Sequence, residues 1–463
     1  MPEKKQSVVV NFAGGWATDF GPSFVAAPQG NALTIPFLSE AKNVLFELDG
    51  APHKIGGTKI LNSVARTSFA GLYDYWKQGT IGAETQAYVG YDDTTIVKID
   101  PTSGVVTQLS SGWEAGKIPC FEVFKDTVLL ATNSTIDTPQ TWDQVAANTS
   151  NLGGSPPKFS FMVKHKNRLF AAGVATNGSR LYYSASLDAT TWTGLDAGSI
   201  DIDPDDGDRI TGLASHKNEL IIFKGPNKLS IHRLIGSSPT GTDAFARIPF
   251  VVGMGAINHN TIFRVNDDVV FASPRGMHSL AATAAFGNYI EAYLSRPILG
   301  FYHDSVNHAT AALATPMGIN YQLRGVAIWI FPTGSLALDT YFVYDYRFQP
   351  GRWSRWTGFL NPNCIAIMQS TPQRQLTPFV GTTTGVIHEL DRQDRSINLT
   401  TAYTADVKLP FVNFGSSAMA KTIDETFFSF VPKGNYNFTV GQTTDSNQQV
   451  TNTVSQSGSD PLG

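Results

Sequence analysis

The chain contains 463 residues, enough to bury a substantial core; 42% are hydrophobic and only 16% are charged. The formal net charge is −4 without a long run of like charges, which excludes a polybasic nucleic-acid arm and an acidic tail. Val8–Val10 is too short for a signal-peptide core, and no stretch approaches the ~18 apolar residues of a membrane span. We therefore expect a soluble, non-secreted protein whose weakly charged polar surface suits β-structure.

The cysteines and histidines form no catalytic or metal-binding pattern. Cys120 and Cys364 lie far apart without a CxxC motif or a nearby His cluster, so we expect two buried thiols rather than a disulfide or a zinc site. The nine histidines are scattered without an HExxH motif, and neither a GxSxG motif nor a P-loop occurs. These patterns predict no enzyme, no catalytic residues and no cofactor.

Residues 1–65 come first in the chain and stand outside any repeat. They read VVVNFAGGWATDFGP, then a connection rich in Pro, Gly and Asn, then AKNVLFELDGAPHKIGGTKIL. Short apolar runs bounded by Gly and Asn are typical of short strands. We expect an N-terminal arm with strands that lead into the next domain.

A repeated hairpin pattern fills residues 66–395. Each copy has a polar turn, a short strand, a turn rich in Gly, Asn or Pro, and a second strand. The copies are 86–100, 125–135, 166–184, 217–234, 266–282, 324–346 and 376–391. In 217–234 the β-rich runs ELIIF and KLSIH flank the turn GPN, where Pro fixes one φ and Gly and Asn tolerate positive φ.

The repetition predicts the fold class. Helical periodicity is hard to find anywhere, and one hairpin repeated along the chain is typical of a β-propeller, whose radial repeat leaves only short edges. We predict an all-β protein in which 66–395 form a propeller of six or seven blades. A pair of stacked β-sandwiches is the alternative, because WD40 and kelch signatures are missing. Residues 396–463 alternate like further strands before a polar tail, which predicts a small C-terminal β element.

The stretch YYSASLDATTWTG, residues 182–194, is similar to a sialidase turn. That turn reads Ser-x-Asp-x-Gly-x-Thr-Trp and recurs in several blades, whereas Ser186, Asp188 and Trp192 occur once and lack the Gly. Sialidase chemistry also needs an arginine cluster, a Tyr nucleophile and an acidic partner, none of which can be assigned. We interpret the stretch as a structural turn in which Asp188 caps backbone N–H groups and Trp192 packs between blades.

Five carboxylates crowd the sequence DIDPDDGD. They are Asp201, Asp203, Asp205, Asp206 and Asp208. A calcium loop of the D-x-D-x-D-G type has Gly at its sixth position, where this run has Asp206. Two interpretations stay open: a solvated loop between blades, which we favour, and a calcium site formed by Asp201, Asp203, Asp205 and Asp208.

The sequence YRFQPGRWSRWTG combines cations with aromatic rings. It places Arg347, Arg352 and Arg355 beside Trp353 and Trp356. Such a mixture stacks on bases or sugars, but a QPG turn followed by one inward and one outward Trp also ends a blade. We favour packing, and keep stacking on Trp192, Trp353 and Trp356 as the alternative.

Two longer stretches carry a family resemblance. Residues 14–62 contain a Gly-rich opening, the Asn-x-x-Phe step at 43–46, an acidic turn and a GG loop. Residues 168–234 continue with RLFAAG, RLYYSASLDATTWTG, DGD, ITG and a strand ending in FK. Both stretches resemble the propeller-bearing tail hub or nozzle proteins of short-tailed bacteriophages, such as the tail accessory proteins of P22-like phages. The rest of the chain resembles these proteins only in its general sequence character.

The resemblance implies a non-enzymatic virion structural protein, made in the host cytoplasm and located in the viral tail. It implies a homohexameric ring that meets the phage adaptor or head-to-tail connector and the tail needle, fibre or spike proteins, with transient passage of double-stranded DNA during ejection. A low-charge surface fits this role, because each Lys or Arg contact with a phosphate would retain the DNA. The alternative function is a carbohydrate-binding or sialidase-like propeller that recognises host glycans.

Overall fold

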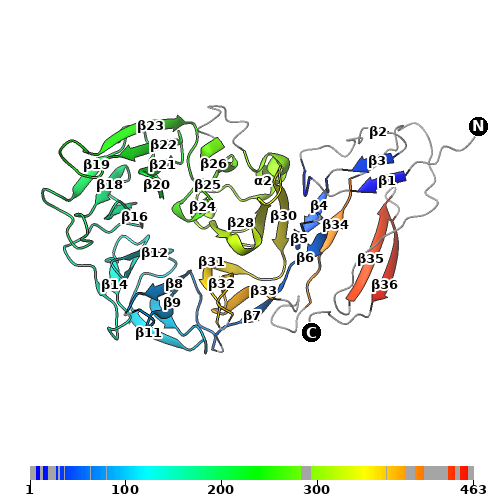
Figure 1. Ribbon diagram of the computed structural model, residues 1–463, viewed down its shortest axis with the longest axis horizontal. Coiled ribbons are helices and arrows are strands. Elements are labelled where there is room, and N and C mark those ends of the chain that lie inside the picture. The colour runs from blue at the N-terminus through cyan, green and yellow to red at the C-terminus, as the bar shows by residue number, and fades with distance from the viewer. Residues whose placement is uncertain are drawn as a thin grey trace, which may run out of the picture. The chain divides into compact units, whose positions relative to one another are not determined.

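The computed structural model describes residues 7–10, 14–18, 28–29, 32–35, 37–48, 50–62, 64–79, 81–282, 293–371, 373–392, 402–410, 436–443 and 449–456. The chain divides into two compact units, Met1–Phe414 and Gly415–Gly463. Strands of the first unit form a seven-bladed β-propeller, seen in Figure 1 as small sheets that follow one another around a common centre. This confirms the all-β propeller, fixes the number of blades at seven and excludes the stacked sandwiches.

The first four blades are four-stranded antiparallel sheets made from consecutive strands. Blade one contains β8 (Gly71–Lys77), β9 (Thr85–Asp92), β10 (Thr95–Ile99) and β11 (Val106–Ser111). Blade two contains β12 (Pro119–Phe124), β13 (Thr127–Thr132), β14 (Gln140–Trp142) and β15 (Ser150–Asn151). Blade three contains β16 (Phe161–His165), β17 (Arg168–Ala172), β18 (Arg180–Tyr183) and β19 (Gly198–Asp201). Blade four contains β20 (Arg209–His216), β21 (Glu219–Gly225), β22 (Ser230–Ile235) and β23 (Ala246–Val252).

The last three blades depart from this pattern. Blade five contains β24 (Phe263–Val265), β25 (Asp268–Ser273) and β26 (Gly276–Ser279). Blade six contains β27 (Met317–Tyr321), β28 (Val326–Phe331), β29 (Thr340–Asp345) and β30 (Arg352–Thr357), extended by β4 (Glu40–Lys42) and β34 (Asp406–Lys408). Blade seven contains β31 (Pro362–Gln369), β32 (Leu376–Thr382), β33 (Ile387–Arg392) and β7 (Gly57–Ile60).

The ends of the first unit complete blades six and seven. β7 is the outer strand of blade seven, and β4 pairs in parallel with β30 of blade six. β34, which lies beyond residue 395, pairs with the other side of β4. The expected division at residues 65 and 395 therefore differs from the observed units, because segments on both sides of the repeats pair with propeller strands.

The seven hairpins expected from the sequence correspond to the second and third strands of the blades, except that 125–135 includes only β13. The hairpin at 217–234 is β21 paired with β22, and Leu220 lies opposite Leu234. In blades two to four a turn containing left-handed residues joins the first two strands: Lys125, Lys166 and Lys217 all have positive φ. The Lys-Asp and Lys-Asn pairs at these turns suit this conformation, because Asn and Asp tolerate it best after Gly.

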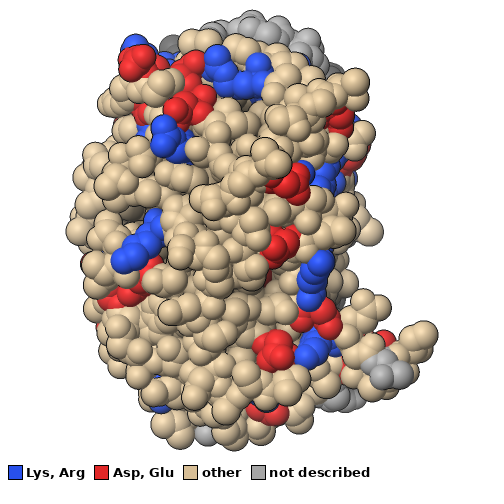
Figure 2. All heavy atoms as spheres, turned by 90° about the vertical axis from the view of Figure 1, so that its left-hand side faces the viewer, with Lys and Arg blue, Asp and Glu red and all other residues tan. Residues whose placement is uncertain are grey.

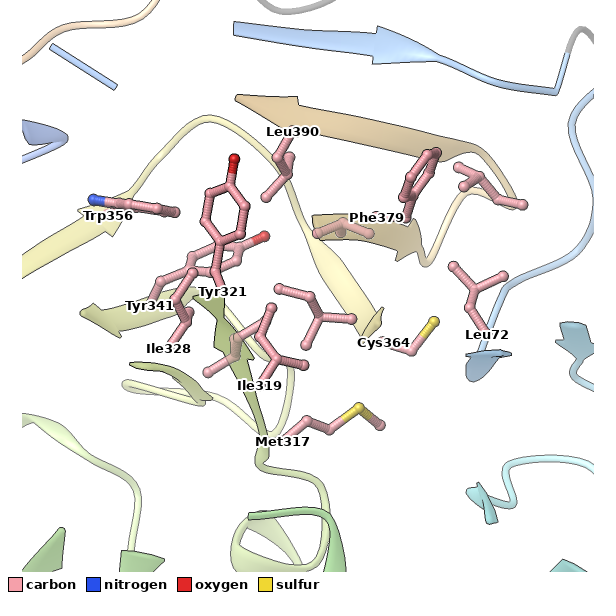
Figure 3. Packing of buried hydrophobic residues seen from close by; sticks show 14 of the residues in the cluster. Leu72, Met317, Ile319, Tyr321, Ile328, Tyr341, Trp356, Cys364, Phe379 and Leu390 are labelled. Carbon is pink, nitrogen blue, oxygen red and sulfur yellow. The ribbon is translucent and has the colours of Figure 1, made fainter. Parts of the chain in front are cut away.

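The largest hydrophobic cluster lies where blades six, seven and one meet, and β31 contacts β8 there to close the ring. Figure 3 shows Met317 and Ile319 of β27 close to Cys364 of β31, with Leu72 of β8 at the far side. Both cysteines are buried and unbonded, as expected. Burial raises the pKa of the Cys120 and Cys364 thiols to about 12, so they stay protonated and unreactive at neutral pH.

The remaining elements are short. In the first unit they are η1 (His259–Thr261), η2 (Arg296–Ile298), α2 (Leu299–Ser305), η3 (Ala312–Ala314), η4 (Gln322–Arg324), the hairpin β5 (Val44–Phe46) and β6 (Pro52–Lys54), and the sheet of β1 (Ser7–Val10), β2 (Pro28–Gln29) and β3 (Ala32–Ile35). The second unit contains the antiparallel hairpin of β35 (Tyr436–Thr443) and β36 (Gln449–Gln456). Among the described helices, none has the length and apolarity to cross a membrane.

Candidate functional site

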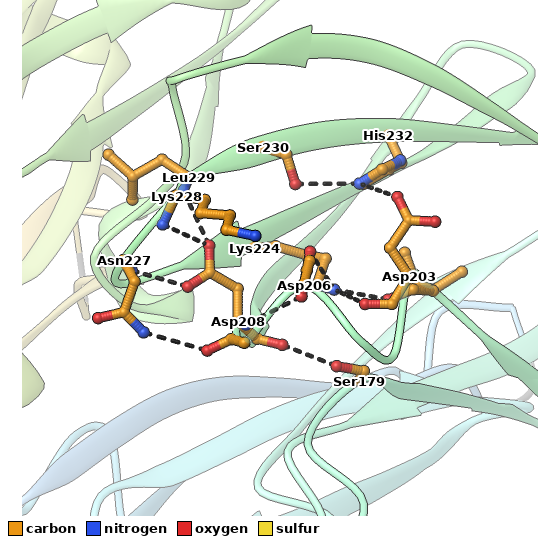
Figure 4. A network of polar contacts seen from close by, with 12 residues as sticks. Ser179, Asp203, Asp206, Asp208, Lys224, Asn227, Lys228, Leu229, Ser230 and His232 are labelled. Atoms are coloured by element: carbon orange, nitrogen blue, oxygen red, sulfur yellow. Dashed lines mark hydrogen bonds and ion pairs between the residues drawn. The ribbon is translucent and has the colours of Figure 1, made fainter.

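The acidic run at 201–208 connects blade three to blade four, and Figure 4 shows it in contact with residues of β21 and β22. Asp201 accepts two hydrogen bonds from Arg180, of 2.6 and 2.9 Å, and these bonds lower the pKa of its carboxyl. Asp203 pairs through one oxygen with Arg247, and its other oxygen lies 3.7 Å from Nε2 of His232. Both carboxylates therefore have cationic or polar partners within the protein.

Asp208 holds the turn between β21 and β22. Its side chain is buried, and its carboxylate accepts backbone N–H groups from Asn227, Lys228 and Leu229 at 2.7, 2.9 and 2.8 Å. A tight turn leaves such donors without strand partners, and a buried unpaired N–H costs free energy. Asp208 therefore stabilises the hairpin of the following blade.

Lys224 of β21 lies at the centre of this network (Figure 4). Its side chain has 0% exposure, and Nζ donates to the carbonyl oxygens of Ile202 and Asp203 at 2.6 and 2.7 Å and to Oδ2 of Asp206 at 2.7 Å. Burial alone would raise the pKa of the Asp206 carboxyl, but hydrogen bonds from Lys224 and the Asp208 backbone, together with the ammonium charge, lower it overall. Each of the three ammonium hydrogens has an acceptor.

The structure bears on both interpretations of the acidic run. The run does join two blades, and Asp201, Pro204, Asp205 and Gly207 are exposed, but Ile202 and Asp208 are buried, so the loop is solvated only in part. The proposed calcium ligands do not converge, because Asp201 and Asp203 bind arginines and Asp208 binds backbone N–H groups, while Asp205 is exposed. Across the described part of the chain, no group of three or more His, Cys, Asp or Glu side chains could hold a metal ion. A lysine of the neighbouring blade supplies the positive charge instead.

The Ser186–Trp192 stretch forms the structural turn that we predicted, in which Asp188 caps a backbone N–H group. The Asp188 carboxylate accepts the backbone N–H of Thr190 at 2.8 Å and its hydroxyl at 2.7 Å. Trp192 is 4% exposed, and its ring centroid lies 5.3 Å from that of Phe159. These contacts stabilise blade three.

The tryptophans of the cation-rich run are buried as well. Trp353 and Trp356 are 0% and 4% exposed, and their Nε1 atoms donate to the carbonyl oxygens of Leu294 and Val44 at 2.8 and 3.2 Å. With Trp192 also buried, the three indoles expose no ring face on which a sugar or base could stack. Packing is therefore the correct interpretation of these residues.

The arginines of the same run bind the N-terminal segment. Arg355 donates two hydrogen bonds of 2.7 Å each to Glu40, a bidentate geometry that fixes both position and orientation. Arg347 donates to the carbonyl oxygen of Phe46 at 2.5 Å. Arg352 is buried, and its guanidinium lies over the Phe46 ring. These side chains hold blade six to the segment that contains β4.

Two asparagines that the sequence analysis did not single out secure the closing blades. Asn43 is 1% exposed and hydrogen-bonds through its side chain to Thr357 of β30. Asn62 donates to the carbonyl oxygen of Gly385 at 3.0 Å and accepts the N–H of Ile387 at 2.7 Å. For Asn43 the sequence offered one signal, the Asn-x-x-Phe step that begins there. That step does not indicate which strand the side-chain amide of Asn43 contacts.

A small recess lies between blades six and seven, lined mainly by apolar side chains that include Leu45, Ile55 and Trp356. Its one carboxylate, Asp391, accepts the Tyr321 hydroxyl at 2.6 Å and Nε of Arg324 at 2.7 Å. Burial first and the Asp391 charge second raise the pKa of Tyr321. This polar pair serves the contact between two blades.

Comparison with known proteins finds similar solved structures at low sequence identity. No protein-family model matches the chain, and a search of curated proteins finds no match. Among solved structures it is similar to a virginiamycin B lyase from Staphylococcus aureus, with 12% identity and a TM-score of 0.45 over 72% of this chain and 98% of the other. It is also similar to a chain of a mitotic checkpoint complex, with 10% identity and a TM-score of 0.44 over 75% and 98%.

A third similar structure is BamB from Moraxella catarrhalis, with 12% identity and a TM-score of 0.34 over 66% of this chain and 81% of the other. Similarity at this level carries no activity from one protein to another. The strand pairing described above defines this chain as a seven-bladed β-propeller protein.

Proposed function

We propose that this protein is a non-enzymatic structural subunit of a short-tailed bacteriophage tail, a propeller of the hub or nozzle ring that extends the portal and adaptor channel. In that position it takes part in genome retention and DNA ejection. The proposal combines the family resemblance of residues 14–62 and 168–234 with what the conspicuous polar residues do. Asp208, Lys224, Arg355 and Asn43 all hold strands or blades together.

The observation that carries the proposal is the locking of the propeller by both ends of its compact unit. β7 closes blade seven from the N-terminal side, while β4 and β34 enter blade six from opposite ends of the sequence. Separating the blades therefore requires several non-local pairings to break together. A part of a channel that holds pressurised DNA needs such resistance to local opening.

The surface agrees with a channel component. On the face in Figure 2, charged side chains occur in small groups of both signs, separated by wide areas without charge. Strong basic patches would bind the phosphate backbone and slow a passing DNA strand. The expected assembly is a homohexamer whose head-to-tail contacts close by rotation, with the adaptor and the needle, fibre or spike proteins as neighbours.

Electron microscopy of the purified full-length protein, combined with mass spectrometry of purified virions, tests the proposal. We expect rings with a central opening and the presence of the protein in tails. A protein that stays monomeric at high concentration and is missing from virions contradicts it.

A further inference from the structure

We infer that the oxygen atoms around Lys224 form a binding site for a monovalent cation, and that the protein fills this site with its own ammonium group. The site lies at the joint between two blades: the oxygens belong to the connection after blade three, and the ammonium belongs to β21 of blade four. This inference is independent of the proposed function, since it concerns how one blade is attached to the next.

The geometry is that of a bound ion rather than of a surface lysine. Long cationic side chains normally keep the charged end in water, whereas Lys224 has 0% exposure. Its three acceptors come from one short segment, residues 202–206, at 2.6 to 2.7 Å. Asp203 has a φ of 40°, and this left-handed residue forms part of the turn that directs the carbonyl oxygens of Ile202 and Asp203 toward one point.

The ligand class follows from the number and spacing of these oxygens. Calcium takes about 6 to 8 oxygens at roughly 2.3–2.6 Å, and magnesium needs an octahedron at about 2.0–2.1 Å. The site around Lys224 supplies only three oxygens, at 2.6 to 2.7 Å from Nζ, which is too few for either metal ion and one for each N–H of an ammonium group. Ammonium and primary alkylammonium ions are therefore the ligands that fit.

Chemical rescue of a shortened side chain tests the inference on the full-length protein. Lys224→Ala removes three methylene groups and the amine, which together correspond to n-propylammonium. We expect the variant to melt roughly 5–10 °C below the wild type, because breaking a buried ion pair leaves a charge without its partner. Addition of n-propylammonium should raise its melting temperature in a saturable manner, as a ligand that binds only the folded state does.

Three comparisons make the test specific. Propan-1-ol has the same length without the charge, and tetramethylammonium has the charge without N–H groups; neither should restore stability at equal ionic strength. Lys228→Ala removes an exposed lysine four residues away and should respond to none of these compounds. An unaltered melting temperature in Lys224→Ala, or equal rescue by propan-1-ol, overturns the inference.

If Lys224→Ala does not fold, Lys224→Met keeps an unbranched side chain one heavy atom shorter and removes the charge. Its melting temperature should fall, and adding Asp206→Asn should recover part of the loss, because the carboxylate charge then no longer lacks a counter-ion. Wild-type stability of Lys224→Met, or a further fall on adding Asp206→Asn, contradicts a cation site.

Discussion

The side-chain amide of Asn43 pairs with the backbone of Thr357 as a peptide group in a neighbouring strand would. Its Nδ2 donates to the Thr357 carbonyl oxygen at 3.0 Å, and its Oδ1 accepts the Thr357 N–H at 2.8 Å. The same Nδ2 donates to the carbonyl oxygen of Thr404 at 2.8 Å. One buried side chain thus joins β30 to segments from both ends of the compact unit.

Replacement of Asn43 should therefore loosen the closure of blade six. Asn43→Ala leaves buried backbone groups of Thr357 without partners, and we expect a loss of about 2–4 kcal/mol in the free energy of unfolding, measured by urea denaturation. Asn43→Asp should also destabilise, because a carboxylate cannot donate to the two carbonyl oxygens.

The control for Asn43 is Asn167, which also has a positive φ but lies exposed in the β16–β17 turn. Asn167→Ala measures the cost of a left-handed Ala, about 1 kcal/mol, without the loss of buried hydrogen bonds. Equal losses for the two variants would show that the amide contacts contribute nothing.

The Arg355–Glu40 pair should couple blade six to the N-terminal segment. The pair is bidentate with side chains 22% and 15% exposed, so a double-mutant cycle with Arg355→Ala and Glu40→Ala should give a coupling energy of about 1–3 kcal/mol. Lys217–Asp267 is the matched surface pair, at 60% and 75% exposure, and its coupling should stay below about 1 kcal/mol. Similar values for both cycles contradict a role in docking.

The propeller should lose stability in mild acid. Burial lowers the pKa of His165 and His388 to about 4 and that of His278 to about 3, against about 6.5 in the unfolded chain. Below pH 6.5 these histidines bind protons in the unfolded chain but stay neutral in the folded protein. The stability present above pH 6.5 therefore falls as the pH approaches 4. Each such group removes about 2 kcal/mol between pH 7.5 and pH 5.

Urea denaturation at pH 7.5 and pH 5.0, at constant ionic strength, measures this slope. Burial raises the pKa of Asp74 and Glu122, which gives an opposite slope, because the folded protein holds those protons more tightly. Replacing His388 by Asn should flatten the pH dependence without abolishing folding. A His388→Asn variant with the same pH dependence as the wild type rules out the effect.

The acidic run should respond to its internal contacts and not to chelators. Asp208→Asn should cost about 1–3 kcal/mol, because a neutral amide oxygen replaces a carboxylate that accepts three N–H groups. Asp205→Asn, at an exposed position, should stay within about 0.5 kcal/mol. EDTA should leave the melting temperature unchanged; a fall that calcium reverses would show that these carboxylates hold a metal after all.

Local signals in the sequence were sufficient for the blade interiors. Alternating apolar residues and turns such as Gly225–Asn227 act over about ten residues, so the hairpin of β21 and β22 could be predicted from its own sequence. The packing of Trp192 and the capping by Asp188 followed from local turn chemistry in the same way.

The tertiary structure alone decided how the ring closes and how the acidic run is neutralised. Asn43 and Thr357 are 314 residues apart, and Lys224 follows Asp206 by a full strand and its turn. A partner at such separation leaves no periodic or turn signal near either residue. Strand pairing and charge compensation across blades depend on which segments the folded ring brings together. The sequence around each residue does not indicate which distant segment that is.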